Sequence, residues 1–300
     1  MASLKIHFMA VLASFTAITT AVPTSHYDTK CPITLDGRVP INATLKTFDT
    51  DASPFNPDFT KGQNLTWSQI LKLPAVAPSK FDLPIHSKAV EVTISDASIF
   101  VPGGGTQQLG FRRAGLLMGN GSDATNVGVK TFHWSVKQDL NAKMNLTHEY
   151  MNVWHEANDY ASNHFSINAG IMLEQDKPTD SNVTTTGLAK NLWKILDRKN
   201  NVIWTTRIDW DVWQNFAVTL DYEKNTLQVY YSREYDSLHP VTALLSQDNS
   251  GGGQMQIGLL KKPTETTSVV YDGYQESGIY EGQIYGGVFI EDSAGGCISA

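Results

Sequence analysis

The chain has 300 residues, a formal net charge of −7 and 18% charged residues, and 41% of its residues are hydrophobic. This length suits one large domain or two small ones, and the composition excludes an intrinsically disordered chain. The acidic balance argues against nucleic acid as a partner, because binding phosphates requires clustered lysine and arginine.

The N-terminus has the pattern of a secretory signal peptide. Lys5 precedes an apolar run over residues 8–18, and the small residues at 19–21 resemble a cleavage site. A membrane anchor is the alternative, but the run is shorter than the ~20 apolar residues that span a bilayer. We therefore expect residues 1–21 to be removed, residues 22–30 to form a short leader, and the protein to be secreted with no membrane partner.

Two further features of the sequence are expected to matter in a secreted protein: its cysteines and its glycosylation sequons. In an oxidising compartment the two cysteines, Cys31 and Cys297, are expected to form a disulfide; the alternative is two buried free thiols. Such a bridge would make residues 31–300 a single domain whose ends lie together. Five N-x-S/T sequons are candidate glycosylation sites: Asn42, Asn64, Asn120, Asn145 and Asn182.

The chain then divides into an irregular part and a strand-rich part. Residues 32–85 are rich in Pro, Asn, Asp and Thr without periodicity, so we predict irregular structure there, with one short helix at 66–73. From residue 88 onward, β-branched and aromatic segments alternate with turn clusters. The predicted strands are 90–95, 109–117, 129–137, 148–156, 164–173, 192–196, 202–206, 214–222, 226–232, 254–260 and 283–291. This pattern predicts an all-β fold, a two-sheet sandwich of the jelly-roll type.

The strand at 148–156 offers one face suited to sugars. Alternation gives one face Glu149, Met151, Val153 and His155, and the other Tyr150, Asn152, Trp154 and Glu156. The second face combines aromatic rings, an amide and a carboxylate, and sugars need both apolar surfaces and hydrogen-bonding groups. The alternative is an exposed sheet face with scattered aromatic residues.

Two other strands carry candidate polar groups. His133, on strand 129–137, is a candidate general acid–base group or sugar ligand, although a lone histidine on a strand is more often neither. Arg113 shares a face with Phe111 and Gly115. No G-x-S-x-G or H-E-x-x-H motif is present, so a serine hydrolase and a zinc protease are unsupported, and no cofactor or metal is expected.

Segments along most of the chain resemble glycoside hydrolase family 131. Among them are LGFRRAGLL (109–117), GVKTFHWSVKQD (128–139), NLTHEYMNVWHE (145–156) and GYQESGIYEGQIYGGVFIEDS (273–293). The resemblance implies a secreted fungal β-glucanase with a β-jelly-roll catalytic domain that hydrolyses β-1,3-, β-1,6- and β-1,4-glucans. It also implies an inverting mechanism, in which two carboxylates ~6.5–9.5 Å apart flank the bond and a water molecule.

The resemblance implies two catalytic carboxylates, and this sequence has only one of them. One ends the motif H-E-Y-x-x-V-x-x-E and corresponds to Glu156, which we take as a catalytic residue. The other follows F-R-R-x, where this chain has Gly115, which has no proton to give. Either His133, Glu149 or His155 takes over the missing role, or the protein retains affinity for glucan with little hydrolysis.

The leading hypothesis is therefore a monomeric β-glucan hydrolase with Glu156 as catalytic carboxylate, and with Trp154, Tyr150, Asn152 and Arg113 in the cleft wall. A non-catalytic β-glucan-binding protein is the second hypothesis, motivated by Gly115. A polysaccharide lyase is a third, but lyases need cationic groups to neutralise a uronate, and the net charge gives no hint of a basic cleft. Linkage preference and endo or exo action are left open.

Overall fold

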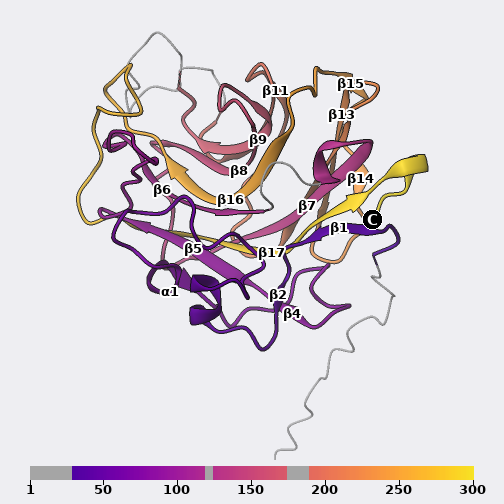
Figure 1. The fold of residues 1–300 in the computed structure, drawn as a ribbon, viewed down its shortest axis with the longest axis horizontal. Helices are drawn as coiled ribbons and strands as arrows, with labels where there is room; N and C mark the ends of the chain where they lie inside the picture. Colours follow the sequence, from indigo (N-terminus) through magenta and orange to yellow (C-terminus); the bar gives the residue numbers. More distant parts are fainter. Residues whose placement is uncertain (1–28, 119–123, 174–188) are drawn as a thin grey trace, which may run out of the picture.

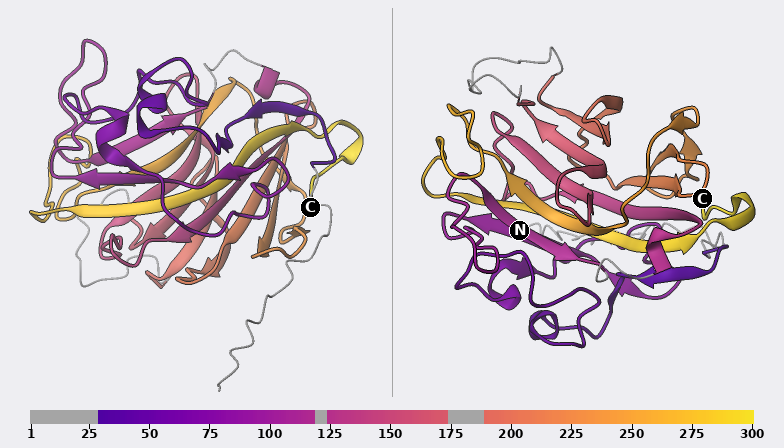
Figure 2. Two further views of the ribbon diagram at one scale, coloured as in Figure 1. Left: turned by 90° about the horizontal axis from the view of Figure 1, so that it is seen from below. Right: turned by 45° about the horizontal axis from the view of Figure 1, so that its top comes forward.

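The computed structural model describes residues 29–118, 124–173 and 189–300, which fold as a sandwich of antiparallel sheets (Figures 1 and 2). The prediction of an all-β, two-sheet fold is confirmed. None of the described helices is long and apolar enough to cross a membrane. The predicted signal peptide lies outside the described residues.

The larger sheet has nine strands. They are β1 (Ile33–Asp36), β3 (Leu71–Lys72), β5 (Val90–Ser95), β7 (Val129–Gln138), β12 (Gln214–Asp221), β13 (Thr226–Arg233), β14 (His239–Pro240), β15 (Leu245–Ser246) and β17 (Tyr280–Asp292). Their order is β14-β13-β12-β7-β17-β5-β3, with β1 also paired to β17 and β15 to β13. The strand nearest the C-terminus, β17, therefore lies inside the sheet.

The smaller sheet has six strands. They are β6 (Arg112–Leu117), β8 (Glu149–Ala157), β9 (Asn163–Gly170), β10 (Leu192–Asp197), β11 (Val202–Arg207) and β16 (Gly253–Lys261), in the order β11-β10-β9-β8-β16-β6. A separate two-stranded sheet pairs β2 (Val39–Pro40) with β4 (Ser87–Lys88). The helical segments are short: η1 (Leu45–Asp49), α1 (Trp67–Ile70), η2 (Ala124–Asn126) and η3 (Ala294–Gly296).

The predictions differ from the structure mainly in the first part of the chain. Residues 33–36 form β1, although irregular structure was predicted, because they pair with β17 from the far end of the chain. The predicted helix is shorter than expected. Thr66 caps α1 with Gln69, but the helix ends at Ile70 because Leu71 pairs with Val92 of β5. Pairing with a distant strand thus overrides local helix propensity.

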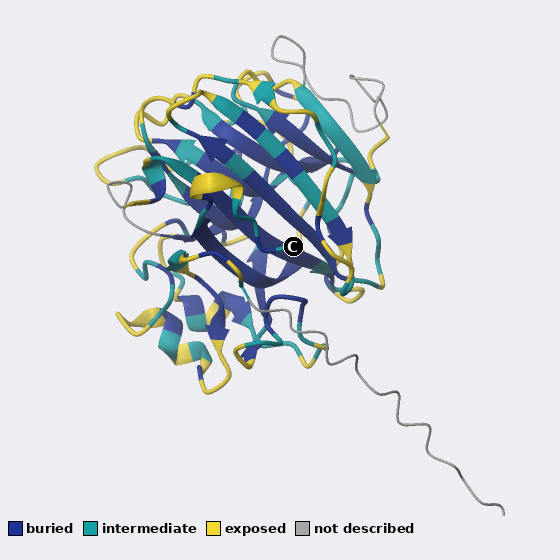
Figure 3. Ribbon diagram, turned by 90° about the vertical axis from the view of Figure 1, so that its right-hand side faces the viewer, coloured by how far each residue is buried: buried dark blue, intermediate teal, exposed yellow. Residues whose placement is uncertain are grey.

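The core between the sheets is built on stacked aromatic rings. Trp134 of β7 stacks on Phe165 of β9, with ring centroids 5.8 Å apart, and on Phe216 of β12 at 5.7 Å. All three side chains are fully buried, and Figure 3 shows how buried residues run along the strands of the sandwich. Because these rings join both sheets, truncating one of them should cost ~3–5 kcal/mol.

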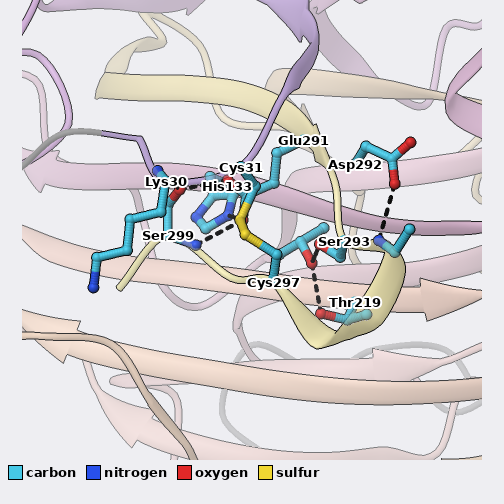
Figure 4. Close-up of a disulfide and its surroundings, with 11 residues drawn as sticks. Lys30, Cys31, His133, Thr219, Glu291, Asp292, Ser293, Cys297 and Ser299 are labelled. Atoms are coloured by element: carbon cyan, nitrogen blue, oxygen red, sulfur yellow. Dashed lines mark hydrogen bonds and ion pairs between the residues drawn. A yellow bond between two sulfur atoms is a disulfide. The ribbon is translucent and has the colours of Figure 1, made fainter.

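The two ends of the described chain meet beside β17 (Figure 4). Cys31, just before β1, forms a disulfide with Cys297, beyond the end of β17. Next to it the buried Glu291 accepts hydrogen bonds from the N–H and the hydroxyl of Ser299, at 2.8 and 2.6 Å, and lies 2.9 Å from His133 Nε2. Burial favours the neutral carboxyl, but these bonds outweigh it and lower the pKa of Glu291.

Replacing both cysteines, Cys31→Ser with Cys297→Ser, should lower the free energy of unfolding by about 4 to 5 kcal/mol. The reason is that the disulfide joins residues 266 positions apart and so restricts the unfolded chain strongly. Denaturant unfolding followed by fluorescence measures the change. Reduced wild-type protein is the control and should unfold like the double variant; an unchanged midpoint in both would contradict the expectation.

Candidate active site

A hollow of about 570 Å³ opens on the face of the six-stranded sheet that points away from the core. Side chains of β6, β8 and β16 form its floor, and three loop segments form its walls: residues 59–60, residues 100–108 and Tyr160. On the same strands Ala114, Val153 and Ile257 belong to the core. We call this site the first hollow; its main residues are Phe59, Arg113, Trp154, Glu156, Tyr160 and Gln256.

Glu156 is the one acidic side chain among the described residues that line the first hollow. Burial raises the pKa of its carboxyl, while the positive charge of Arg113 and a hydrogen bond from Gln256 act in the opposite direction. In that bond Gln256 Nε2 donates to Glu156 Oε2 at 3.0 Å. Glu156 is thus a partly buried carboxyl that keeps its proton at higher pH than an exposed glutamate does.

Arg113 is held between two aromatic rings. Its guanidinium carbon lies 5.4 Å from the ring centroid of Phe100 and 5.8 Å from that of Trp154. Arg113 is 8% exposed, and it donates to Gln108 Oε1 at 3.4 Å. Burial lowers its pKa, and Glu156 opposes this change. Because a guanidinium keeps its proton at neutral pH, Arg113 supplies a fixed positive charge near the carboxyl.

Gly115 faces the same group of side chains. A Cβ atom at this position would lie 2.8 Å from Gln256 Oε1 and 3.0 Å from the indole of Trp154. The space beside Gly115 is therefore occupied by Trp154, which packs against β6 because no side chain is there. The family resemblance predicts a second carboxylate at this position, and the indole ring of Trp154 occupies the space instead.

The solvent-exposed aromatic rings of the first hollow belong to residues that the sequence analysis did not propose as site residues. Trp154 lines the first hollow but is only 1% exposed, so it offers little surface to a ligand. Phe59 and Tyr160, in two of the wall loops, are 48% and 72% exposed. Tyr160 also has a positive φ of 58°, uncommon for a non-glycine residue. Aromatic residues in turns were the available signal for these positions.

Tyr150 and Asn152 point to the other side of β8 from Trp154. The register of β8 against β9 shifts between Met151 and Val153, and this β-bulge breaks the alternation from which one common face was predicted. Tyr150 donates from its hydroxyl to Glu281 Oε2 at 2.7 Å, and Asn152 Nδ2 lies 3.4 Å from Gln283 Oε1. Both bonds lead to β17, so the predicted grouping of Tyr150 and Asn152 with Trp154 and Glu156 is corrected.

Glu149 lies on the same sheet face as Glu156 but far from it. It lines a second hollow of about 440 Å³, whose main residues are Glu149, Ser166, Asn168, Val202, Lys262 and Thr267. Its carboxylate accepts bonds from Asn168 Nδ2, Lys262 Nζ and the N–H of Leu173, each at 2.7 Å. Glu149 and Glu156 stand near opposite ends of β8, on the order of 20 Å apart at ~3.4 Å per residue, which exceeds the ~6.5–9.5 Å of an inverting pair.

The two candidate histidines also lie outside the first hollow. His155 is fully buried on the core side of β8, where its Nδ1 lies 3.1 Å from Nδ1 of His164, and burial lowers the pKa of both rings. His133 stands on β7, in the other sheet, beside Glu291. Among the described residues, no group of three or more His, Cys, Asp or Glu side chains is placed to hold a metal ion.

The sequons differ in accessibility. Asn42 and Asn64 are exposed. Asn145 is half-buried, and its Nδ2 donates to Glu276 Oε1 at 2.8 Å while its Oδ1 accepts from the hydroxyl of Thr147 at 2.8 Å. Asn120 and Asn182 lie outside the described residues.

A family model matches most of the chain, and solved structures of that family share the fold. The model of the glycoside hydrolase 131 catalytic N-terminal domain matches residues 33–296. The fold is similar to a GH131 β-glucanase catalytic domain from Podospora anserina, with a TM-score of 0.64 and 20% identity over 89% of this chain and 99% of that one. A family 131 catalytic domain from Coprinopsis cinerea is similar at a TM-score of 0.64, with 16% identity over 88% and 95% of the two chains. A search of curated proteins finds no match.

Arg113→Met should raise the pKa of Glu156 further above its usual value, because the nearby positive charge that favours the carboxylate is lost. Carbon-13 NMR of the glutamate carboxyl groups measures the pKa in the folded protein. Arg113→Lys is the matched control, since it keeps the charge, and its Glu156 pKa should stay near that of the wild type. An unchanged pKa in Arg113→Met would show that Arg113 does not act on this carboxyl.

Proposed function

We propose that the chain, which belongs to glycoside hydrolase family 131, is a secreted β-glucan hydrolase with Glu156 as its catalytic carboxylate. The proposed substrates are β-1,3-, β-1,6- and β-1,4-linked glucans, and the proposed active form is a monomer. One observation carries the proposal: Glu156 is the only carboxyl among the described residues that line the first hollow, and it is partly buried there. The family match and the fold shared with a β-glucanase catalytic domain support the substrate class.

In the proposed reaction Glu156 acts as the general acid. It donates its proton to the glycosidic oxygen while the bond between that oxygen and the anomeric carbon breaks. A water molecule adds to the anomeric carbon from the opposite face and releases a proton to solvent, so the configuration inverts. A single displacement suits the first hollow, because its described lining holds no second carboxylate to form a covalent intermediate.

The raised pKa of Glu156 supports the acid role. A general acid works only while it is protonated, so hydrolysis should decline as the pH rises through the pKa of this carboxyl. Burial raises the pKa of Glu156 and so moves that decline to higher pH, while the charge of Arg113 makes the rise in pKa smaller. A positioned base for the water is missing from the described lining, and losing one acid–base partner commonly costs ~10²–10⁴-fold in rate.

Secretion is supported by two features of the molecule. The Cys31–Cys297 disulfide is typical of proteins that fold in an oxidising compartment. Asn42 and Asn64 stand exposed at the surface, where an oligosaccharide could be attached without displacing packed side chains. Glycosylation at the five sequons stays a prediction.

Glu156→Gln should abolish the release of reducing sugar from laminarin and from cello-oligosaccharides, because the amide cannot donate a proton to the leaving oxygen. The substitution keeps the size of the side chain, so the melting temperature should change little. Glu223→Gln, at an exposed glutamate in the turn between β12 and β13, is the matched control and should keep wild-type activity. Full activity in Glu156→Gln would refute the role of Glu156.

A non-catalytic β-glucan-binding protein is the second candidate function, and the surroundings of Gly115 favour it. Trp154 occupies the space beside this glycine, so a two-carboxylate site is incomplete in the described first hollow. This candidate predicts measurable affinity for β-glucans with no release of reducing sugar from the wild type. Hydrolysis by the wild type that depends on Glu156 would exclude it.

Gly115→Glu should increase hydrolysis, by up to ~10²–10⁴-fold, because it adds a carboxylate next to Gln256, whose amide binds Glu156. To admit the new Cβ atom, Gln256 Oε1 has to shift and the Trp154 indole has to move by a few tenths of an ångström, so the melting temperature should fall moderately. Gly115→Gln is the control: it makes the same steric demand without the carboxylate. Equal rates for the two variants would mean that position 115 does not face the reacting atoms.

A further inference from the structure

The second hollow continues the first across the sheet. The two hollows share Met151 of β8 and Asn163 of β9 in their linings. The first reaches Arg113 on β6, and the second reaches Val202 on β11, so together they cross all six strands. With ~4.8 Å between neighbouring strands, the path from β6 to β11 is about 24 Å long.

The polar groups of the second hollow suit an uncharged ligand. Glu149 and Lys262 are the only charged residues in its described lining, and Lys262 Nζ lies 2.7 Å from Glu149 Oε1. Their charges compensate each other, so the described lining leaves no cation to pair with a uronate or another anion. Amide and hydroxyl side chains supply the remaining polar atoms: Asn163, Ser166, Asn168, Asn200, Thr266 and Thr267.

Apolar side chains complete the lining. Leu196 and Val202 come from β10 and β11, and Val269 comes from the loop after β16. A hollow that combines apolar surface with many amides and hydroxyls matches the chemistry of a sugar, whose C–H faces are apolar and whose edges carry hydroxyls. An aliphatic ligand would leave these polar groups without partners.

We propose that the second hollow binds glucosyl units of a β-glucan chain at a distance from the bond at Glu156. The inference rests on the proposed function for the place where the chain is cut, but binding in the second hollow does not depend on hydrolysis. Since Glu149 and Glu156 are on the order of 20 Å apart along β8, a chain that occupies both hollows contains several glucosyl units. The protein therefore favours long chains over disaccharides.

Filling the second hollow tests this inference. Val202 is partly buried on the edge strand β11, where an aromatic residue suits strand structure, and Val202→Trp would place an indole in the hollow. Thr267→Trp fills it from an exposed loop and serves if the first variant does not fold. Leu244→Trp is the matched control, because it adds the same ring at a position that is 61% exposed and lines neither hollow.

The measurement is titration calorimetry with a disaccharide and a hexasaccharide of the β-glucan series, in proteins that also carry Glu156→Gln so that the ligands stay intact. The protein that carries only Glu156→Gln should bind the hexasaccharide more tightly than the disaccharide. Val202→Trp and Thr267→Trp should weaken hexasaccharide binding by about tenfold, the equivalent of one or two lost hydrogen bonds, and leave disaccharide binding unchanged. Leu244→Trp should alter neither.

The outcomes separate this inference from the proposed function. If folded Val202→Trp and Thr267→Trp keep the full hexasaccharide affinity, or if the hexasaccharide binds no more tightly than the disaccharide, the inference is overturned. If the wild type releases no reducing sugar but the loss of hexasaccharide binding occurs as expected, the inference stands and the proposed hydrolase fails in favour of a binding protein. If no oligosaccharide binds at all, both are wrong.

Discussion

The fold depends on the pairing of one strand, β17, inside the larger sheet. Its residues pair with β7 on one side and with β5 and β1 on the other, and Cys297 beyond its end is linked to Cys31 before β1. β17 also fixes the site, because its side chains Glu281 and Gln283 bind the inward-facing Tyr150 and Asn152 of β8. Since β17 follows the other described strands of the larger sheet, its pairings with β1, β5 and β7 join residues far apart in the chain, and such distant pairings fold slowly.

The register shift between Met151 and Val153 of β8 then decides what the first hollow contains. The bulge at Asn152 changes which side chains point outward, so that Met151, Trp154 and Glu156 line the hollow while Tyr150 and Val153 face the core. Without the bulge, strict alternation would turn Met151 away from the side that carries Trp154 and Glu156. The one carboxyl of the described first hollow is thus presented by the strand that also joins the two sheets through Tyr150 and Asn152.

The surroundings of Glu156 balance opposing effects. Partial burial disfavours the charged carboxylate, while the Arg113 guanidinium and the Gln256 amide favour it. Arg113 can stay close because it lies between the rings of Phe100 and Trp154, and Trp154 can lie there because Gly115 has no side chain. The glycine that removes one expected carboxylate therefore also allows the packing that holds a positive charge beside the other.

The sequence by itself determined the all-β class, most of the long strands and the disulfide partners, because strand alternation, turn clusters and a pair of cysteines are local or pairwise signals. The resemblance to the family put Glu156 forward as a candidate, and its catalytic role stays a prediction. Only the tertiary structure decided that residues 33–36 form a strand, that Tyr150 turns inward, that His133, Glu149 and His155 lie away from Glu156, and that Phe59 and Tyr160 supply the exposed rings. These features depend on contacts between residues far apart in the chain and on a bulge, and neither leaves a periodic pattern in the sequence.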